Sequence, residues 1–173
     1  MKKINYMVMG IMCSMLLVSC QQDMGTSEPV MNGMIMSDGQ PDRQLMMASS
    51  NEDDILWEVS QAFNNMDAAG VFAHSTDTVR FISADGYRGP FTQAMMEEQF
   101  ATLDSIHWNI SAIIPVQGEG SESVSVLVDG SEEVWGKDGS YETYRLFERF
   151  VFEDGKFHTV YQWSGVIPEP DEE

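Results

Sequence analysis

Residues 141–163 read YETYRLFERFVFEDGKFHTVYQW, and their pattern predicts an antiparallel hairpin. Apolar side chains fall mainly on even-numbered positions between 144 and 152, which is the twofold period of a strand with one buried face. Asp154-Gly155 supplies the positive φ that a tight hairpin turn requires. A second strand over 157–163 then returns along the first, so the chain is expected to end its domain in two long paired strands.

Two further strands precede this hairpin. Apolar residues alternate along 106–117, and the face expected against the core comprises Ile106, Trp108, Ile110, Ala112, Ile114 and Val116. Pro115 lacks a backbone donor, which favours an edge or a bulge late in that strand. A shorter strand over 124–128 ends at Asp129-Gly130, where a turn or bulge is expected.

The region before residue 104 has helical spacing instead. One apolar stripe recurs from Ile55 to Met66, and the polar and acidic residues that follow Ser50 suit a helix start. A short helix over 67–74, a strand over 78–82 and a third helix opening at Gly89-Pro90 are expected next. Helices followed by an antiparallel meander indicate the α+β class, with helices packed on one face of a curved sheet.

The order of these elements resembles the NTF2-like superfamily and its SnoaL-like branch. The resemblance covers about residues 53–165, and it depends on Asn64-Asn65-Met66-Asp67, Phe72-Ala73-His74, Asp77-Thr78-Val79, Gly89, the turn after Phe152, and the ending Trp163-Ser164. It implies a cone in which three N-terminal helices pack on a curved, mostly antiparallel sheet around a pocket. Homodimers are frequent in this superfamily, so a homodimer is expected.

The N-terminus is typical of an exported protein. Lys2 and Lys3 precede an apolar run of about 13 residues, which is shorter than the roughly 20 residues of a membrane-spanning helix. The run closes with small residues before Cys20, and this segment resembles a bacterial lipoprotein signal. The resemblance implies cleavage, lipid attachment at Cys20, and a domain held at a membrane of the cell envelope, outside the cytoplasm. An ordinary signal peptide with an incidental cysteine is the alternative.

These patterns divide the chain into four parts. A lipoprotein signal peptide is expected over 1–19, and a flexible linker without periodicity over 20–50. The NTF2-like domain is expected over 51–166, and an acidic tail over 167–173.

Composition excludes several kinds of function. The formal net charge is −19, which repels nucleic acid phosphates, so no nucleic acid partner is expected. The two cysteines, Cys13 and Cys20, both lie in the N-terminal segment, so the domain has no thiol chemistry. The three histidines, His74, His107 and His158, show no metal-ligand spacing, and neither a metal site nor another cofactor is expected.

Glu148 is the candidate for acid chemistry. If the even-numbered face of its strand points inward, Glu148 lies among aromatic side chains, where lost hydration raises the pKa of a carboxyl group. The resemblance to the ketosteroid isomerases of the superfamily implies a protonated acid at this position. Their general base aligns near Phe81 and their helix tyrosine near Val59, so two of three catalytic groups are missing. The alternative is a Glu148 that pairs with an arginine or faces solvent.

The expected pocket is largely aromatic. Its predicted lining residues are Tyr144, Glu148, Phe150, Tyr161, Trp163 and Phe81. Tyr161 and Trp163 are included because of the resemblance, which implies that alternate residues after the Asp-Gly turn face the cavity. The alternative is that the rings of Tyr161 and Trp163 pack in the core and line no pocket.

Three functions follow, and the first is preferred. The first is a membrane-anchored envelope protein whose domain binds a small, largely apolar ligand without catalysis. The second is an isomerase, cyclase or dehydratase that uses Glu148 as acid, with Tyr144 or Tyr161 as partner and a base from among Asp77, Asp85 and His74. The third is a protein-interaction module that dimerises through Phe147 and Val151, flanked by Arg145 and Arg149.

Overall fold

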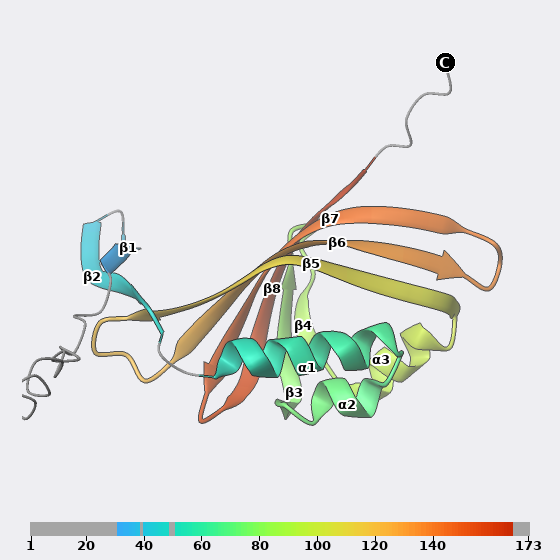
Figure 1. Cartoon of the computed structure of the whole chain (residues 1–173), viewed down its shortest axis with the longest axis horizontal. Helices are drawn as coiled ribbons and strands as arrows, with labels where there is room; N and C mark the ends of the chain where they lie inside the picture. The colour runs from blue at the N-terminus through green and yellow to red at the C-terminus, as the bar shows by residue number, and fades with distance from the viewer. Residues whose placement is uncertain (1–30, 39, 49–50, 168–173) are drawn as a thin grey trace, which may run out of the picture. The chain divides into compact units, whose positions relative to one another are not determined.

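The computed structural model describes residues 31–167 except 39, 49 and 50 (Figure 1). Its elements in chain order are β1 Met31–Ser37, β2 Gln40–Met47, α1 Glu52–Asn64, α2 Ala68–Phe72, β3 Ser75–Ser83, β4 Arg88–Phe91, α3 Gln93–Phe100, β5 Leu103–Gly118, β6 Val124–Gly136, β7 Tyr141–Glu153 and β8 Lys156–Val166. The signal segment, Cys20 and residues 168–173 lie outside the described residues.

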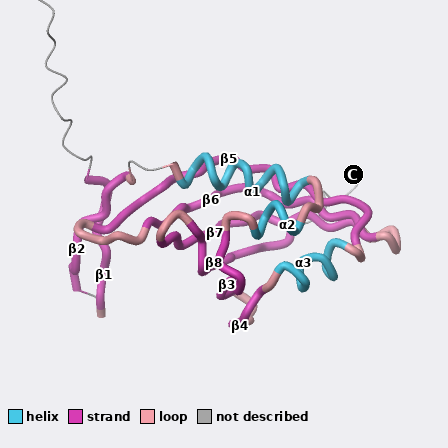
Figure 2. The backbone as a smooth tube through the Cα atoms, turned by 90° about the horizontal axis from the view of Figure 1, so that it is seen from below, coloured by secondary structure: helices cyan, strands magenta, loops and turns pink. Residues whose placement is uncertain are grey.

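The strands of the described part form one eight-stranded sheet in the order β1-β2-β5-β6-β7-β8-β3-β4. Neighbours run antiparallel except β3 and β8, which pair in parallel. Helices α1, α2 and α3 lie on one face of this sheet, as Figure 2 shows from the helical side. The expected α+β architecture, with helices on a mostly antiparallel sheet, is confirmed.

Helix α1 packs on the sheet through a narrow apolar stripe. Leu56 and Val59 are fully buried, whereas Trp57 points to solvent and is 56% exposed. At the C-terminal end of α1, the Asn64 side chain donates to the carbonyl oxygen of Trp108 and accepts from the backbone nitrogen of Trp108, at 3.2 and 2.6 Å. This pair of bonds fixes the helix against β5. No helix in the described part of the chain is long and apolar enough to cross a bilayer.

The third helix begins later than the sequence predicts. Residues Arg88–Phe91 form the edge strand β4, where Pro90 is tolerated because an edge strand leaves backbone donors unpaired. Helix α3 starts at Gln93, and the Thr92 side chain caps it by accepting from the backbone nitrogen of Met95. The predicted opening at Gly89-Pro90 is therefore wrong.

The predicted linker also differs from the structure over part of its length. Residues Met31–Ser37 and Gln40–Met47 form an antiparallel hairpin, and β2 pairs with β5 from Leu45 to Met47. Asp38, at the hairpin turn, has a φ of 49°. Asp38-Gly39 is a common hairpin signal, so the missing period in this methionine-rich segment concealed two strands. Residues 20–30 of the predicted linker lie outside the description.

A bulge in β5 changes which side chains face the core. Ile110 pairs with Gly130 and Ala112 with Asp129, so Ser111 is the extra residue. Beyond it Ile113 packs against the core and Ile114 is 40% exposed, which reverses the predicted alternation at these two positions, whereas Val116 is buried as predicted. Strand β6 was expected to end at Asp129-Gly130, but it continues to Gly136.

A second bulge lies at the start of β8. Phe152 pairs with Phe157 and Val151 with Thr159, which leaves His158 as the extra residue. Phe157 faces the core, but after the bulge the inward positions are Val160 and Gln162. The two bulges together decide which residues of β5 and β8 surround the interior.

Candidate functional site

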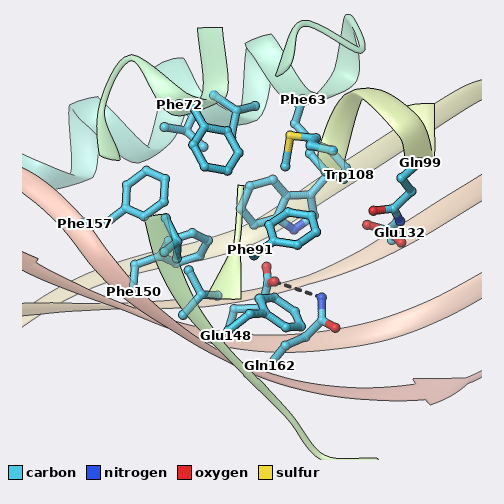
Figure 3. A pocket seen from close by; sticks show the side chains of 16 residues that line it. Phe63, Phe72, Phe91, Gln99, Trp108, Glu132, Glu148, Phe150, Phe157 and Gln162 are labelled. Atoms are coloured by element: carbon cyan, nitrogen blue, oxygen red, sulfur yellow. Dashed lines mark hydrogen bonds between the residues drawn. The ribbon is translucent and has the colours of Figure 1, made fainter. Parts of the chain in front are cut away.

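A cavity of about 260 Å³ lies between the helices and the sheet (Figure 3). Every element from α1 to β8 contributes to its wall. The lining residues are Val59, Phe63, Val71, Phe72, Val79, Phe81, Phe91, Met96, Gln99, Trp108, Glu132, Glu148, Phe150, Phe157, Val160 and Gln162. The wall is therefore mostly aliphatic and aromatic, with two carboxyl and two amide groups.

The aromatic rings of this wall contact one another. Phe81 and Phe91 have ring centroids 5.6 Å apart, and Phe150 lies 5.5 Å from Phe157 and 6.1 Å from Trp108. Such edge and tilted arrangements are favourable for aromatic pairs. The indole Nε1–H of Trp108, whose side chain is buried, finds no acceptor among the described residues.

Glu148 lies on the inward face of β7, among these rings. It is 6% exposed, and Oε1 accepts a hydrogen bond of 3.1 Å from Nε2 of Gln162, its partner on β8. Burial raises the pKa of Glu148 to about 8, against the lowering effect of the Gln162 bond, and the charge of Glu132 adds to the rise. The carboxyl group is therefore mainly protonated at neutral pH.

Glu132 is a second acid in the same cavity. Its side chain is half-buried, and the loss of hydration raises its pKa to about 7. It lies on β6 four residues from Val128, the register partner of Glu148, so the two backbones are roughly 13 Å apart along the strand direction. Figure 3 shows Glu132 beside Gln99, to one side of the Glu148 carboxyl group. The cavity thus contains two acids that change charge near neutral pH.

No protein-family model matches the chain, and neither does any curated protein. Solved structures do match. An NTF2-like protein of unknown function from Burkholderia pseudomallei is 22% identical, with a TM-score of 0.51 over 65% of this chain and 89% of its own. An NTF2-like protein from Burkholderia xenovorans is 15% identical, with a TM-score of 0.51 over 69% and 92%.

The chain has the NTF2-like fold. An LEH-like epoxide hydrolase from M. tuberculosis is similar to it as well, at 13% identity and a TM-score of 0.52 over 65% of this chain and 80% of its own. At such low sequence identities the likeness shows a shared architecture only. The chemistry of this cavity has to be argued from the residues that line it.

Three of the six predicted lining residues surround the cavity of this NTF2-like domain. Glu148, Phe150 and Phe81 are in its wall. Tyr144 shares the inward face of β7 but lies outside the lining, and its hydroxyl group donates to Glu142. That hydrogen bond, with burial and nearby acidic charge, raises the pKa of Tyr144 to about 12.

Tyr161 and Trp163 point away from the cavity, and their predicted place in its wall is wrong. The His158 bulge shifts the alternation of β8 by one residue, so Val160 and Gln162 line the cavity instead. Trp163 is 47% exposed on the outer face of the sheet, where its ring lies 6.2 Å from that of Tyr161. Counting alternate residues from Phe157 could not reveal the extra residue.

Glu132 and Gln162 are the polar lining residues of the sheet that the sequence reading missed. Glu132 was missed because β6 was expected to end at Asp129-Gly130. The sequence did contain a signal for the position of Glu132. The alternation of Val128 continues through Gly130 and Glu132 to Val134 on one face of the strand. Extending that period through the glycine would have placed Glu132 on the same side of the sheet as Val128.

The three bases suggested by the sequence, Asp77, Asp85 and His74, lie outside the cavity wall. Asp77 and Asp85 are exposed, and Asp85 accepts a hydrogen bond from Ser83 that lowers its pKa. His74 Nε2 lies 3.2 Å from a Glu58 carboxylate oxygen. Within the described ranges, no three His, Cys, Asp or Glu side chains are grouped so that they could hold a metal ion.

Proposed function

We propose that this NTF2-like domain binds a small, largely apolar molecule that turns a polar group toward Glu148. The observation that carries the proposal is the cavity of about 260 Å³ with the buried Glu148 carboxyl group in its aromatic wall. An apolar site surrounding a few convergent polar groups is the usual form of a small-molecule site.

The volume limits the size of the ligand. An apolar cavity of about 150 Å³ holds one benzene molecule. A cavity of about 260 Å³ therefore suits a molecule of one or two rings. Glu148 and Gln162 supply the polar contacts that orient it.

Binding of 2-naphthol, a fluorescent two-ring alcohol, tests this proposal. Val160→Phe places a ring in the cavity, and Val166→Phe makes the same change at a position on β8 that is 69% exposed. We expect saturable binding that Val160→Phe weakens by about tenfold or more, equivalent to 1.4 kcal/mol, and that Val166→Phe leaves unchanged. No binding, or equal loss in both variants, would contradict it.

A second candidate function is proton-transfer catalysis of the isomerase, cyclase or dehydratase type. Its support is the pair of cavity acids: Glu148, with a pKa raised to about 8, donates a proton, and Glu132, with a pKa raised to about 7, accepts one. Cyclic ketones with an adjacent double bond are suitable substrates for a screen. Any turnover should fall at least about a hundredfold in Glu148→Gln, and an unchanged rate would remove Glu148 from this role.

We propose that the domain is held at a membrane of a bacterial cell envelope, outside the cytoplasm, through lipid on Cys20. The support is the signal-like sequence that precedes Cys20, because this segment lies outside the described residues. Mass spectrometry of membrane fractions should show lipid on the wild-type chain and none on Cys20→Ser. Lipid that persists on the variant would contradict the anchor.

We also propose that the outer face of β7 and β8 joins two copies of the chain. Phe147 is 43% exposed and its ring lies 5.7 Å from that of Trp163, while the Arg149 guanidinium group lies 5.5 Å from the Tyr161 ring. Aromatic and arginine side chains are enriched in protein interfaces. This outer aromatic cluster, namely Phe147, Tyr161, Trp163 and Arg149, therefore suits a homodimer contact.

A further inference from the structure

The two cavity acids lack a positive partner. None of the residues that line the cavity is a lysine, an arginine or a histidine. Among the described residues, Glu132 accepts no hydrogen bond and forms no ion pair, and Glu148 accepts one hydrogen bond, from the neutral amide of Gln162. Buried carboxylates are normally paired with a cation or a metal, so either acid, once ionised, has no positive partner among the residues that line the cavity.

The arginines closest in sequence to Glu148 cannot balance it. Arg145 and Arg149 are exposed on the opposite face of β7, where Arg145 bonds Asp129 at 2.6 Å and Arg149 donates to Ser125. Tyr144 is the register partner of Glu132 on β7, and its hydroxyl group is engaged by Glu142. The remaining polar lining groups, Gln99 and Gln162, are neutral.

The rest of the wall also favours positive charge. Seven aromatic rings line the cavity, namely Phe63, Phe72, Phe81, Phe91, Trp108, Phe150 and Phe157. The face of an aromatic ring carries negative electrostatic potential and attracts alkylammonium groups. A net charge of −19 draws cations toward the molecule as a whole.

We propose that the ligand of this cavity is a small organic cation, an amine or quaternary ammonium compound whose apolar groups contact the rings and whose charge faces Glu148 and Glu132. This inference rests on the proposed small-molecule binding and specifies its ligand class. Desolvation of the cation is offset by the two carboxylates and the aromatic faces, whereas a neutral ligand leaves both carboxylates without a positive partner.

Cation binding must then be coupled to proton release. A positive charge beside Glu148 and Glu132 favours their ionised forms, so binding displaces protons that the empty cavity holds. No other titratable side chain is present in the cavity wall. Affinity for a cation of fixed charge is therefore expected to rise with pH.

Two probes of the same shape separate charge from hydrophobicity. Phenyltrimethylammonium carries a fixed positive charge, and tert-butylbenzene is its neutral analogue. Isothermal titration calorimetry at pH 6 and pH 8.5 should show tighter binding of phenyltrimethylammonium, with an affinity on the order of tenfold higher at pH 8.5. Titration in two buffers of different ionisation enthalpy should reveal release of protons.

Glutamine variants locate the charge. Glu148→Gln and Glu132→Gln should each weaken phenyltrimethylammonium binding by about tenfold at pH 8.5, while tert-butylbenzene binding is retained. Glu133→Gln is the matched control, since Glu133 bonds Asn109 and Tyr141 at the surface and lies outside the cavity wall. Retained tert-butylbenzene binding also shows that each variant is folded.

The outcomes distinguish the two proposals. If tert-butylbenzene binds as tightly as phenyltrimethylammonium at both pH values, the cation inference is overturned and small-molecule binding stands. If neither probe binds, both proposals fail. Equal weakening by Glu133→Gln would assign the effect to net charge and would likewise overturn the cation inference.

Discussion

Glu148 is buried in a wall of aromatic rings, where ionisation of its carboxyl group is unfavourable. The aromatic wall removes water from the carboxyl group, and the Gln162 amide replaces only part of that hydration. The folded protein therefore keeps a proton that an unfolded chain would release at a lower pH. This residue links the stability of the fold to the chemistry of the cavity.

Glu148→Gln should remove a pH-dependent loss of stability. Burial raises the pKa of Glu148 from 4.5 to about 8, so its stabilising proton is fully present below pH 4.5 and is lost as pH rises through about 8. The free energy of unfolding of the variant, relative to wild type, should increase between pH 5 and pH 9 by at most about 5 kcal/mol, at 1.36 kcal/mol per pKa unit. Urea unfolding at several pH values measures this difference.

Glu133→Gln provides the comparison for that experiment. It removes the same formal charge from a neighbouring position on the other face of β6, so it controls for the change in net charge. A Glu148→Gln difference that stays constant over this pH range would mean that Glu148 titrates as an exposed acid.

At the scale of elements, a bulge in β5 and another in β8 change which side chains face inward, and the β8 bulge decides which of its residues reach the cavity. The twofold alternation of β7 is unbroken, and the sequence therefore placed Glu148, Phe150 and Phe152 on the buried face. In β5 and β8 a single extra residue reverses the alternation. Simple periodicity cannot locate such a residue, because the hydrophobic pattern on each side of it remains regular.

Helices were predictable to the extent that their termini carried local signals. The acidic first turn and apolar stripe of α1 placed it correctly, within a few residues at each end. The start of α3 was misplaced because Gly89-Pro90 resembles a helix opening, while pairing with β3 keeps this segment extended. The conformation of residues 88–91 is therefore determined by long-range strand pairing, which no local sequence pattern encodes.

Gly130→Ala should strongly destabilise the sheet. A Cβ atom at Gly130 would lie 2.5 Å from the carbonyl oxygen of Asn109, beside the β5 bulge. We expect a loss of about 1–3 kcal/mol in the free energy of unfolding by urea. Gly165→Ala, which meets no atom within 4 Å, should change it by less than about 0.5 kcal/mol. Equal effects would show that β5 and β6 do not approach so closely at the bulge.

At the scale of the molecule, a strongly acidic chain carries arginine and aromatic side chains on the outer face of its sheet. Arg145 and Arg149 share the outer side of β7 with Phe147, and Arg80 lies on β3, which pairs with β8. The sequence predicts an interaction surface at Phe147 and Val151. Because of the β8 bulge, Trp163 and Tyr161 also lie on this outer face. This combination is the basis of the proposed homodimer.

Trp163→Ala should dissociate that homodimer. Sedimentation velocity at about 100 μM should show a dimer for wild type and mainly monomer for the variant, because a central aromatic residue at an interface typically contributes 2 kcal/mol or more. Trp57→Ala removes a similarly exposed tryptophan from α1 and should leave the dimer intact. A monomeric wild type, or a dimer that survives Trp163→Ala, would place self-association elsewhere or exclude it.

The environment of the Glu148 carboxyl group tests the whole account most directly. NMR titration of its side-chain carboxyl carbon, assigned with Glu148→Gln, should give a pKa of about 8. Addition of phenyltrimethylammonium should lower that midpoint. A midpoint near 4.5, unaffected by the probe, would show that water surrounds the carboxyl group and that the domain has no ligand cavity at this position.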